Sequence, residues 1–161
     1  MIPGIIEKYK SKGVLFDTNL LVLLVIGIYR RARIATFKRT RQYAPEDFAL
    51  VLSLIEKFDR RITTPNILTE ANNLVRQLPE SEHPAVSRIM AHLIAEIFEQ
   101  YRISAEAVRY LGFARLGLTD CITASIANEA LVLTDDFRLS NTLFHLGRDV
   151  ININHLRDFN T

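Results

Sequence analysis

The sequence has almost no cysteine, no long hydrophobic run and no glycine-rich phosphate-binding loop, and each absence excludes a class of protein. Cys121 is the single cysteine of the 161 residues, so no internal disulfide can form, which fits a reducing cytoplasm. The most apolar run, 20–29, has ten residues, whereas a membrane-spanning helix needs ~20. Residues 1–13 mix apolar and charged side chains and do not resemble a signal peptide. We therefore expect a cytoplasmic protein without a membrane segment.

Positive charge is concentrated in one segment of an otherwise slightly acidic chain. No acidic residue occurs between Asp17 and Glu46, and six cations fall within this gap. Removing these six charges from the net charge of +2 leaves −4. This segment, which we call the basic insertion (about residues 29–44), indicates a polyanionic partner, with nucleic acid first, and the alternative is a solvated loop. Its cations are Arg30, Arg31, Arg33, Lys38, Arg39 and Arg41.

Short apolar runs alternate with helical periodicities along the chain. Runs that end at polar residues predict strands, and apolar residues that recur every three or four positions predict helices. Strands separated by helices imply crossover connections, and therefore a mostly parallel sheet covered on both faces, the three-layer α/β/α class. With 48% hydrophobic residues and no second pattern, residues 1–161 are expected to form a single domain. Strands are predicted at 13–16, 61–64, 101–103, 131–134 and 150–153, and helices at 20–29, 45–58, 67–78, 86–98, 105–116 and 119–129.

Acidic residues recur where predicted strands end and where the helices that leave the same edge begin. Ligands of parallel sheets bind beyond the carboxyl ends of the strands, so we expect these acids to share one rim. Converging carboxylates would bind a hard divalent cation, because an isolated buried charge is too costly. The alternative for each acid is a helix cap or a turn. The residues are Asp17 after the run 13–16, Glu70, Asp120, and the pair Asp135 and Asp136 after the run 131–134.

Taken in order, four motifs around these acids resemble the acidic motifs of PIN-domain nucleases. That family includes the toxin ribonucleases of toxin–antitoxin pairs. The resemblance extends over about residues 13–155, and it implies a PIN-like α/β/α fold and cleavage of RNA that depends on Mg²⁺ or Mn²⁺. The motifs are Phe16-Asp17-Thr18-Asn19, a strand-following Glu70, Leu118-Thr119-Asp120 and Leu133-Thr134-Asp135-Asp136-Phe137.

The resemblance also implies catalytic acids, metal ligands and two supporting residues. The fourth acid is left open, because Asp136 fits the family's spacing after threonine whereas Asp135 could instead point into the site. Carboxylate oxygens suit Mg²⁺ or Mn²⁺, and the sequence offers no Cys/His cluster for zinc. A bound cation would polarise a phosphate oxygen and activate a water for in-line attack on phosphorus. The implied catalytic acids are Asp17, Glu70, Asp120 and Asp136; the metal ligands are Asp17, Asp120, Asp136 and Asp135; the supporting residues are Asn19 and Thr134.

The basic insertion is expected to hold the substrate. Tyr29, Phe37 and Tyr43 alternate with its cations, and stacking on bases together with phosphate contacts suits single-stranded RNA. The alternative is a surface for a protein partner, such as an acidic antitoxin segment. The helices predicted at 20–29 and 48–58 have more apolar surface than a single helix layer would bury against the sheet. This excess is consistent with a homodimer.

Two functions follow from these observations. The first is a metal-dependent endoribonuclease, a phosphodiester hydrolase that would act as the toxin of a toxin–antitoxin pair. The second is a PIN-like module that binds RNA or protein through a catalytically weak site. Each of the four motifs contains its acidic residue, which favours the enzyme. Activity on DNA instead of RNA is a third option.

Overall fold

The computed structural model describes residues 1–110 and 112–157, and a parallel sheet forms its centre. Every strand pairing in the five-stranded sheet is parallel, in the order β3-β2-β1-β4-β5. The three-layer α/β/α class predicted from the sequence is confirmed. The strands are β1 (Val14–Phe16), β2 (Arg61–Thr63), β3 (Phe98–Glu99), β4 (Leu131–Thr134) and β5 (Val150–Asn152).

The central strands are apolar along their whole length because helices cover both faces of the sheet. All residues of β1 and β4 are buried, without the alternation expected of a strand that faces water on one side. Side chains from Tyr9 to Ile153 contribute to the main core cluster. Among the described helices, none is both long and apolar enough to cross a bilayer.

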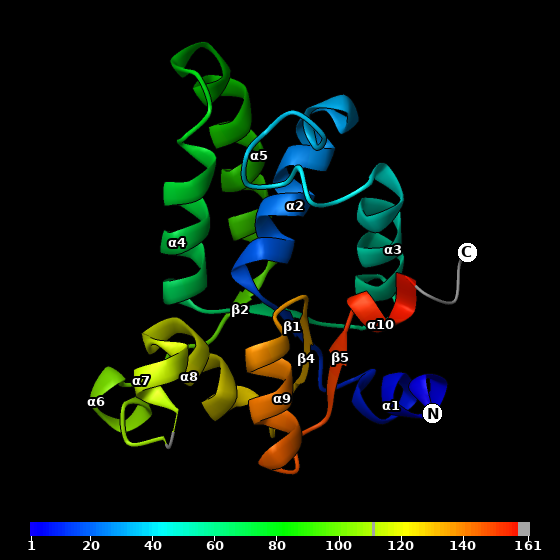
Figure 1. Ribbon diagram of the computed structural model, residues 1–161, viewed down its shortest axis with the longest axis vertical. Coiled ribbons are helices and arrows are strands. Elements are labelled where there is room, and N and C mark those ends of the chain that lie inside the picture. The colour runs from blue at the N-terminus through cyan, green and yellow to red at the C-terminus, as the bar shows by residue number, and fades with distance from the viewer. Residues whose placement is uncertain (111, 158–161) are drawn as a thin grey trace.

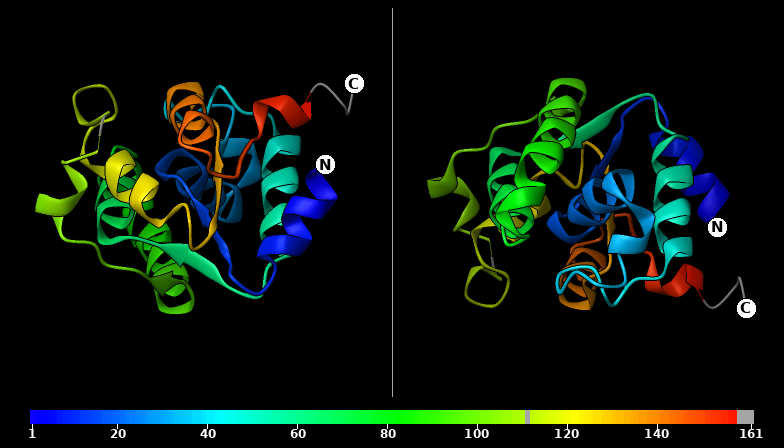
Figure 2. Two further views of the ribbon diagram at one scale, coloured as in Figure 1. Left: turned by 90° about the horizontal axis from the view of Figure 1, so that it is seen from below. Right: turned by 90° about the horizontal axis from the view of Figure 1, so that it is seen from above.

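Two groups of helices form the outer layers. Helix α2 contacts α3, α4 and α5, and α8 contacts α6, α7 and α9; a contact between α4 and α8 joins the two groups. Figure 1 shows the first group in the upper part of the molecule and α6 to α9 in the lower part, and the end-on views of Figure 2 show α5 and α9 on opposite sides of the strands. The helices are α1 (Ile2–Tyr9), α2 (Thr18–Tyr29), α3 (Pro45–Ile55), α4 (Pro65–Val75), α5 (His83–Glu96), α6 (Ser104–Ala107), α7 (Phe113–Leu116), α8 (Leu118–Ile126), α9 (Phe137–His145) and α10 (Asn154–Arg157), with 3₁₀ turns η1 (Arg31–Arg33) and η2 (Glu80–Glu82).

Three predicted elements differ from the structure. The helix predicted at 86–98 ends at Glu96, and Phe98 belongs to β3 and is exposed. The strand predicted at 101–103 is wrong, because β3 lies earlier and pairs Phe98 with Ile62. The single helix predicted at 105–116 is also wrong: α6 ends at Ala107, a turn follows, and α7 begins at Phe113. Residue 111 of that prediction lies outside the described residues. The predicted end at Gly117 is correct, because its φ of +79° breaks the helical path.

Candidate functional site

Four of the predicted acids line one cleft beside the carboxyl ends of the strands. The cleft has a volume of about 180 Å³ and is more polar than apolar. Its acids come from four different segments: the residue after β1, the middle of α4, the first turn of α8 and the loop after β4. The prediction that Glu70 lies where its helix begins is wrong, because α4 already begins at Pro65. The structure therefore brings together residues that lie as far apart as 17 and 136 in the sequence. The lining residues are Asp17, Thr18, Asn19, Glu70, Leu74, Asp120 and Asp136.

Asp17 is the most deeply buried of these acids, with 6% of its surface exposed. It is the N-cap of α2, and its Oδ1 accepts a hydrogen bond of 3.0 Å from the backbone N–H of Leu20. Its Oδ2 accepts from the Thr134 hydroxyl and, at 3.3 Å, from the Asp135 N–H. Asp17 therefore caps a helix and also lines the cleft. Three donors fix its carboxylate in one orientation.

Burial, and after it the nearby charge of Asp135, raises the pKa of Asp17 to about 7. The hydrogen bonds from Thr134 and Leu20 act in the opposite direction, because they favour the ionised carboxylate. Burial, followed by the charges of Asp136 and Glu70, likewise raises the pKa of Asp120 to about 7. Without a counter-ion, these two acids carry protons that an exposed aspartate would have lost near pH 4.

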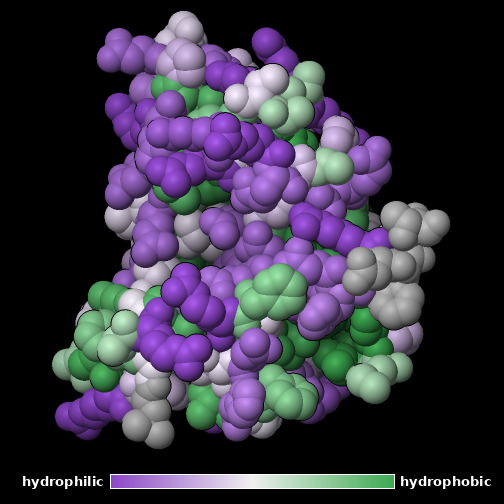
Figure 3. Space-filling view, viewed as in Figure 1, coloured by the Kyte–Doolittle hydropathy of each residue, from purple (hydrophilic) through white to green (hydrophobic). Residues whose placement is uncertain are grey.

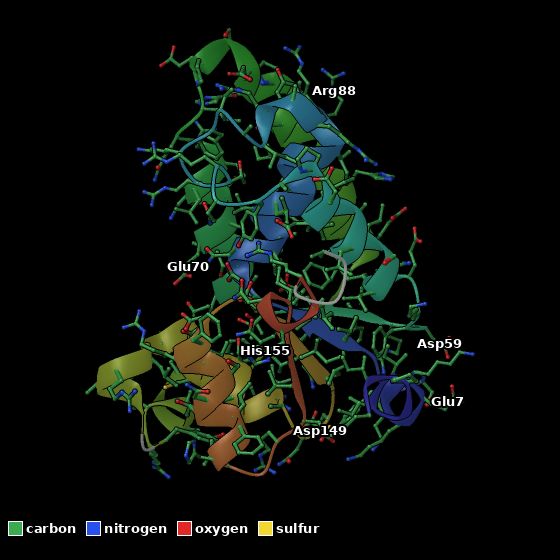
Figure 4. The ribbon with its side chains drawn as sticks, turned by 45° about the vertical axis from the view of Figure 1, so that its right-hand side comes forward. Glu7, Asp59, Glu70, Arg88, Asp149 and His155 are labelled. Carbon is green, nitrogen blue, oxygen red and sulfur yellow. The ribbon has the colours of Figure 1, made fainter. Side chains whose placement is uncertain are left out.

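Glu70 is exposed, and two threonine hydroxyls orient its carboxylate. Thr18 donates to Oε2 at 3.2 Å and Thr119 donates to Oε1 at 2.5 Å. Figure 4 shows Glu70 projecting outward from α4. Each threonine is the direct neighbour of a cleft acid in sequence, and that adjacency is the signal that sequence reasoning left unused. The two hydroxyls link Glu70 to the segments that carry Asp17 and Asp120.

The neighbouring carboxylates of Asp135 and Asp136 have different surroundings. The Oδ1 of Asp136 caps α9 by accepting from the N–H groups of Arg138 and Leu139, at 2.6 and 3.2 Å, and Asp136 lines the cleft. Asp135 is not among the described lining residues. Its Oδ1 accepts from the Asn19 side chain at 3.2 Å, and its Oδ2 accepts from the Tyr43 hydroxyl.

The two predicted supporting residues both contact cleft acids or their neighbours. The Thr134 hydroxyl donates to Asp17 and accepts from the N–H of Asp136 at 2.9 Å, so it bridges two acids. Asn19 supports Asp135 and also lines the cleft.

A polar network that sequence reasoning missed lies behind Asp135. Arg157 of α10 donates to both carboxylate oxygens of Asp47, at 2.8 and 3.0 Å. Asn154, also in α10, donates to the backbone oxygen of Asp135 at 2.7 Å. These contacts, with that of Tyr43, join the basic insertion, α3 and α10 behind the cleft wall. No local pattern could have found them, because the partners are about 20 to 110 residues apart.

The donor set of the cleft suits a hard cation. No three Asp, Glu, His or Cys side chains of the described chain are arranged closely enough to hold a metal ion by themselves. Mg²⁺ commonly binds through only one or two carboxylates and takes its other ligands from water and substrate phosphate. The described lining residues offer carboxylate, hydroxyl and amide oxygens and include no cysteine or histidine. They therefore fit Mg²⁺ or Mn²⁺ and not zinc.

The basic insertion is folded onto the body of the protein. Arg33 forms a two-point ion pair with Glu82, with distances of 2.7 and 3.1 Å, and Arg39 donates to Gln77 at 2.8 Å. The structure contradicts the prediction that Phe37 and Tyr43 stack on bases, because both are at least 96% buried. The apolar side chains of the insertion are used for packing.

All cations of the insertion except Arg33 have exposed side chains. Figure 3 shows strongly hydrophilic residues across the upper part of one face, over α4 and the basic insertion. The side chain of Arg31 lies 4.7 Å from the ring centre of Phe48, and that of Arg30 lies 5.3 Å from the ring centre of Tyr29. The exposed cations are Arg30, Arg31, Lys38, Arg39 and Arg41.

Comparison of the chain with models of protein families, with curated proteins and with solved structures returned no match.

Proposed function

We propose that this protein is a metal-dependent endoribonuclease that hydrolyses RNA phosphodiester bonds in the cleft. The observation that carries this proposal is the meeting of Asp17, Glu70, Asp120 and Asp136, from four segments, around one space of about 180 Å³. Burial and neighbouring acids raise the pKa values of Asp17 and Asp120 to about 7, so the ionised forms of these carboxylates are unfavourable without a cation. The resemblance of the four acidic motifs to those of PIN-domain nucleases supports the same activity.

The protein's own groups divide into holding and orienting roles. Asp17, which three donors fix, and Asp120 would hold the cation, and Asp136 lies close enough to Asp120 for its charge to act there. When bound, the cation lowers the pKa of a coordinated water and stabilises negative charge on the phosphate. Glu70 orients the attacking water, because its exposed carboxylate is set by the two threonine hydroxyls. Asp135 would not bind the cation. Its carboxylate accepts a hydrogen bond from Asn19 and so holds that cleft residue in place.

A binding module with an idle site is the second candidate. The spacing of the acids favours this second candidate. Among the described residues, no three Asp, Glu, His or Cys side chains lie close enough together to hold a metal ion. Under this alternative the carboxylates would still bind a cation, but substrate would not be cut. The antitoxin partner, the homodimer and the cytoplasmic location stay predictions.

Cleavage assays distinguish these candidates. Labelled single-stranded RNA and single-stranded DNA of the same sequence are incubated with the protein in Mg²⁺, in Mn²⁺ and in EDTA. We expect cleavage within the RNA in either metal and none in EDTA. Cleavage of DNA alone would contradict the assignment to RNA, and binding without cleavage would favour the second candidate.

Cation binding should stabilise the folded protein. At a Mg²⁺ or Mn²⁺ concentration about 100 times the dissociation constant, linkage gives ~2.7 kcal/mol, or a rise in melting temperature of roughly 5–10 °C for a chain of this size. The measurement is thermal unfolding with increasing metal at constant ionic strength and pH 7.5. The Asp120→Asn variant should lose most of this rise. An equal rise in that variant would mean that the cation binds elsewhere.

The exposed cations of the basic insertion should contribute to RNA binding through phosphate contacts. Replacing Arg30, Arg31 and Lys38 with glutamine is expected to weaken binding and to reduce the slope of log K against log salt by about 2, since each single-strand contact contributes about 0.7. Arg33 is left in place because its ion pair with Glu82 anchors the insertion. Fluorescence anisotropy at several salt concentrations measures both quantities.

The matched control removes three exposed lysines near the amino ends of β1 and β2: Lys10, Lys12 and Lys57. This control has the same change in net charge but lies at the other edge of the sheet. Equal salt slopes in the two triple variants would show that the insertion does not contact the phosphates.

A further inference from the structure

An exposed aromatic pair includes the residue that directly follows the cleft acid Asp136. Phe137 is the first residue of α9, follows the cleft residue Asp136, and has 53% of its surface exposed. Its ring centre lies 5.9 Å from that of His155 in α10, with the two planes tilted by 55°. His155 is exposed as well, and Figure 4 shows it near the middle of the molecule. The pair presents aromatic surface to solvent, and Phe137 does so one residue after a cleft acid.

Both members of the pair are held by the end of β4. The carboxylate of Asp136 caps α9 and so fixes the backbone at Phe137. On the other side, Asn154 donates to the backbone oxygen of Asp135 at 2.7 Å, and the N–H of Ile153 donates to the backbone oxygen of Thr134 at 2.9 Å. These bonds position α10, and with it His155, next to the loop that carries the acids. The aromatic pair and the cleft are therefore parts of one local structure.

A cation accompanies the aromatic pair. Arg138 follows Phe137 and is exposed, and its charge lies close enough to Asp120 to oppose the rise in the pKa of that acid. An aromatic ring and an arginine at the rim of an acidic cleft are the groups with which proteins bind single strands, through base stacking and phosphate contact. In this arrangement the ring would contact a base while the guanidinium faces the backbone of the same strand.

We propose that Phe137 and His155 form a platform on which an unpaired base of single-stranded RNA stacks, next to the phosphate that enters the cleft. The proposal rests on the proposed ribonuclease function for its choice of ligand. It transfers the stacking role from Phe37 and Tyr43, which are buried, to an aromatic pair outside the basic insertion. The insertion then contributes charge, and the platform contributes contact with the bases.

The test measures binding in EDTA, so that it does not depend on cleavage. A short single-stranded RNA carrying the fluorescent base 2-aminopurine is titrated with wild-type protein and with Phe137→Leu, which keeps an apolar side chain but removes the ring. We expect roughly tenfold weaker binding and loss of the fluorescence quenching that stacking produces. Phe137→Trp should restore both, because the larger ring stacks at least as well.

Helix α9 supplies a matched control at its other end. Phe144 is also exposed, at 74%, and its ring centre lies 6.0 Å from that of His145. The Phe144→Leu variant should bind RNA as the wild type does. Wild-type affinity and quenching in Phe137→Leu, or equal losses in the two leucine variants, would overturn the platform. Weaker binding in Phe137→Leu alone would support it even if the cleavage assays detect no ribonuclease activity.

Discussion

Replacing Asp17 with asparagine is expected to lower the rate of RNA cleavage by roughly 10³-fold or more, since a metal-stabilised transition state depends on several kcal/mol of charge stabilisation. The change removes one negative charge from the best-fixed carboxylate of the cleft. Asparagine is an equally good N-cap, so its side-chain oxygen can still accept from the N–H of Leu20 and α2 should remain intact. Loss of activity would then report the site and not unfolding.

The matched control for this variant is Asp59→Asn. Asp59 is exposed and precedes β2, so it lies at the amino edge of the sheet, and Figure 4 shows it at the right of the molecule with Glu70 at the left. Single-turnover cleavage of labelled RNA is measured for the wild type and both variants at the same Mg²⁺ concentration. Wild-type rates in Asp17→Asn would refute the proposed site, and the observed cleavage would then come from a contaminant or another surface.

The stability of the metal-free protein should fall as the pH rises from about 5 to about 8. Asp17 and Asp120 have native pKa values of about 7, above the ordinary value of 3.8, so the folded state binds more protons than the unfolded state between these values. Their stabilising contribution is complete below about pH 4 and is lost as the pH passes 7. For Asp120, whose pKa rises from 3.8 to about 7, the contribution to the free energy of unfolding is on the order of 4 kcal/mol.

The Asp120→Asn variant separates this effect from other titrations. Its amide cannot ionise, so the decline in the free energy of unfolding between pH 5 and 8 should be roughly halved. Glu82 and Asp149 have lowered pKa values and change stability in the opposite sense, but only below their ordinary values of 4.5 and 3.8. Urea unfolding in EDTA at several pH values measures the decline. Stability that rises with pH over this window would contradict the burial of the two acids.

The parts of the site that the sequence predicted are those set by local pattern. The buried runs of β1 and β4 required strands, and the acids that follow them could only lie at the carboxyl edge of a parallel sheet. Leu118-Thr119-Asp120 begins a helix at that edge because Gly117 breaks the chain before it. These inferences need only the period of the apolar residues and the direction of the strands.

The parts that it missed depend on contacts between distant segments. The sequence does not predict helix α9, because its two buried apolar residues, Leu139 and Leu143, are too few to mark a helical period. The roles of Phe37 and Tyr43 were wrong because an aromatic residue among cations has the same local pattern whether it packs inward or faces solvent. The partners of Glu70 are residues 18 and 119, which no spacing rule connects.

The positions of the acids along their helices have an electrostatic consequence. Asp17 caps α2, Asp136 caps α9, and Asp120 lies in the first turn of α8. The amino end of an α-helix carries a partial positive charge equivalent to about +0.5, so three such ends face the acid cleft. Their field offsets part of the carboxylate charge that would otherwise repel an approaching phosphodiester. The backbone thereby lowers the electrostatic barrier to substrate at the same positions where the side chains attract a cation.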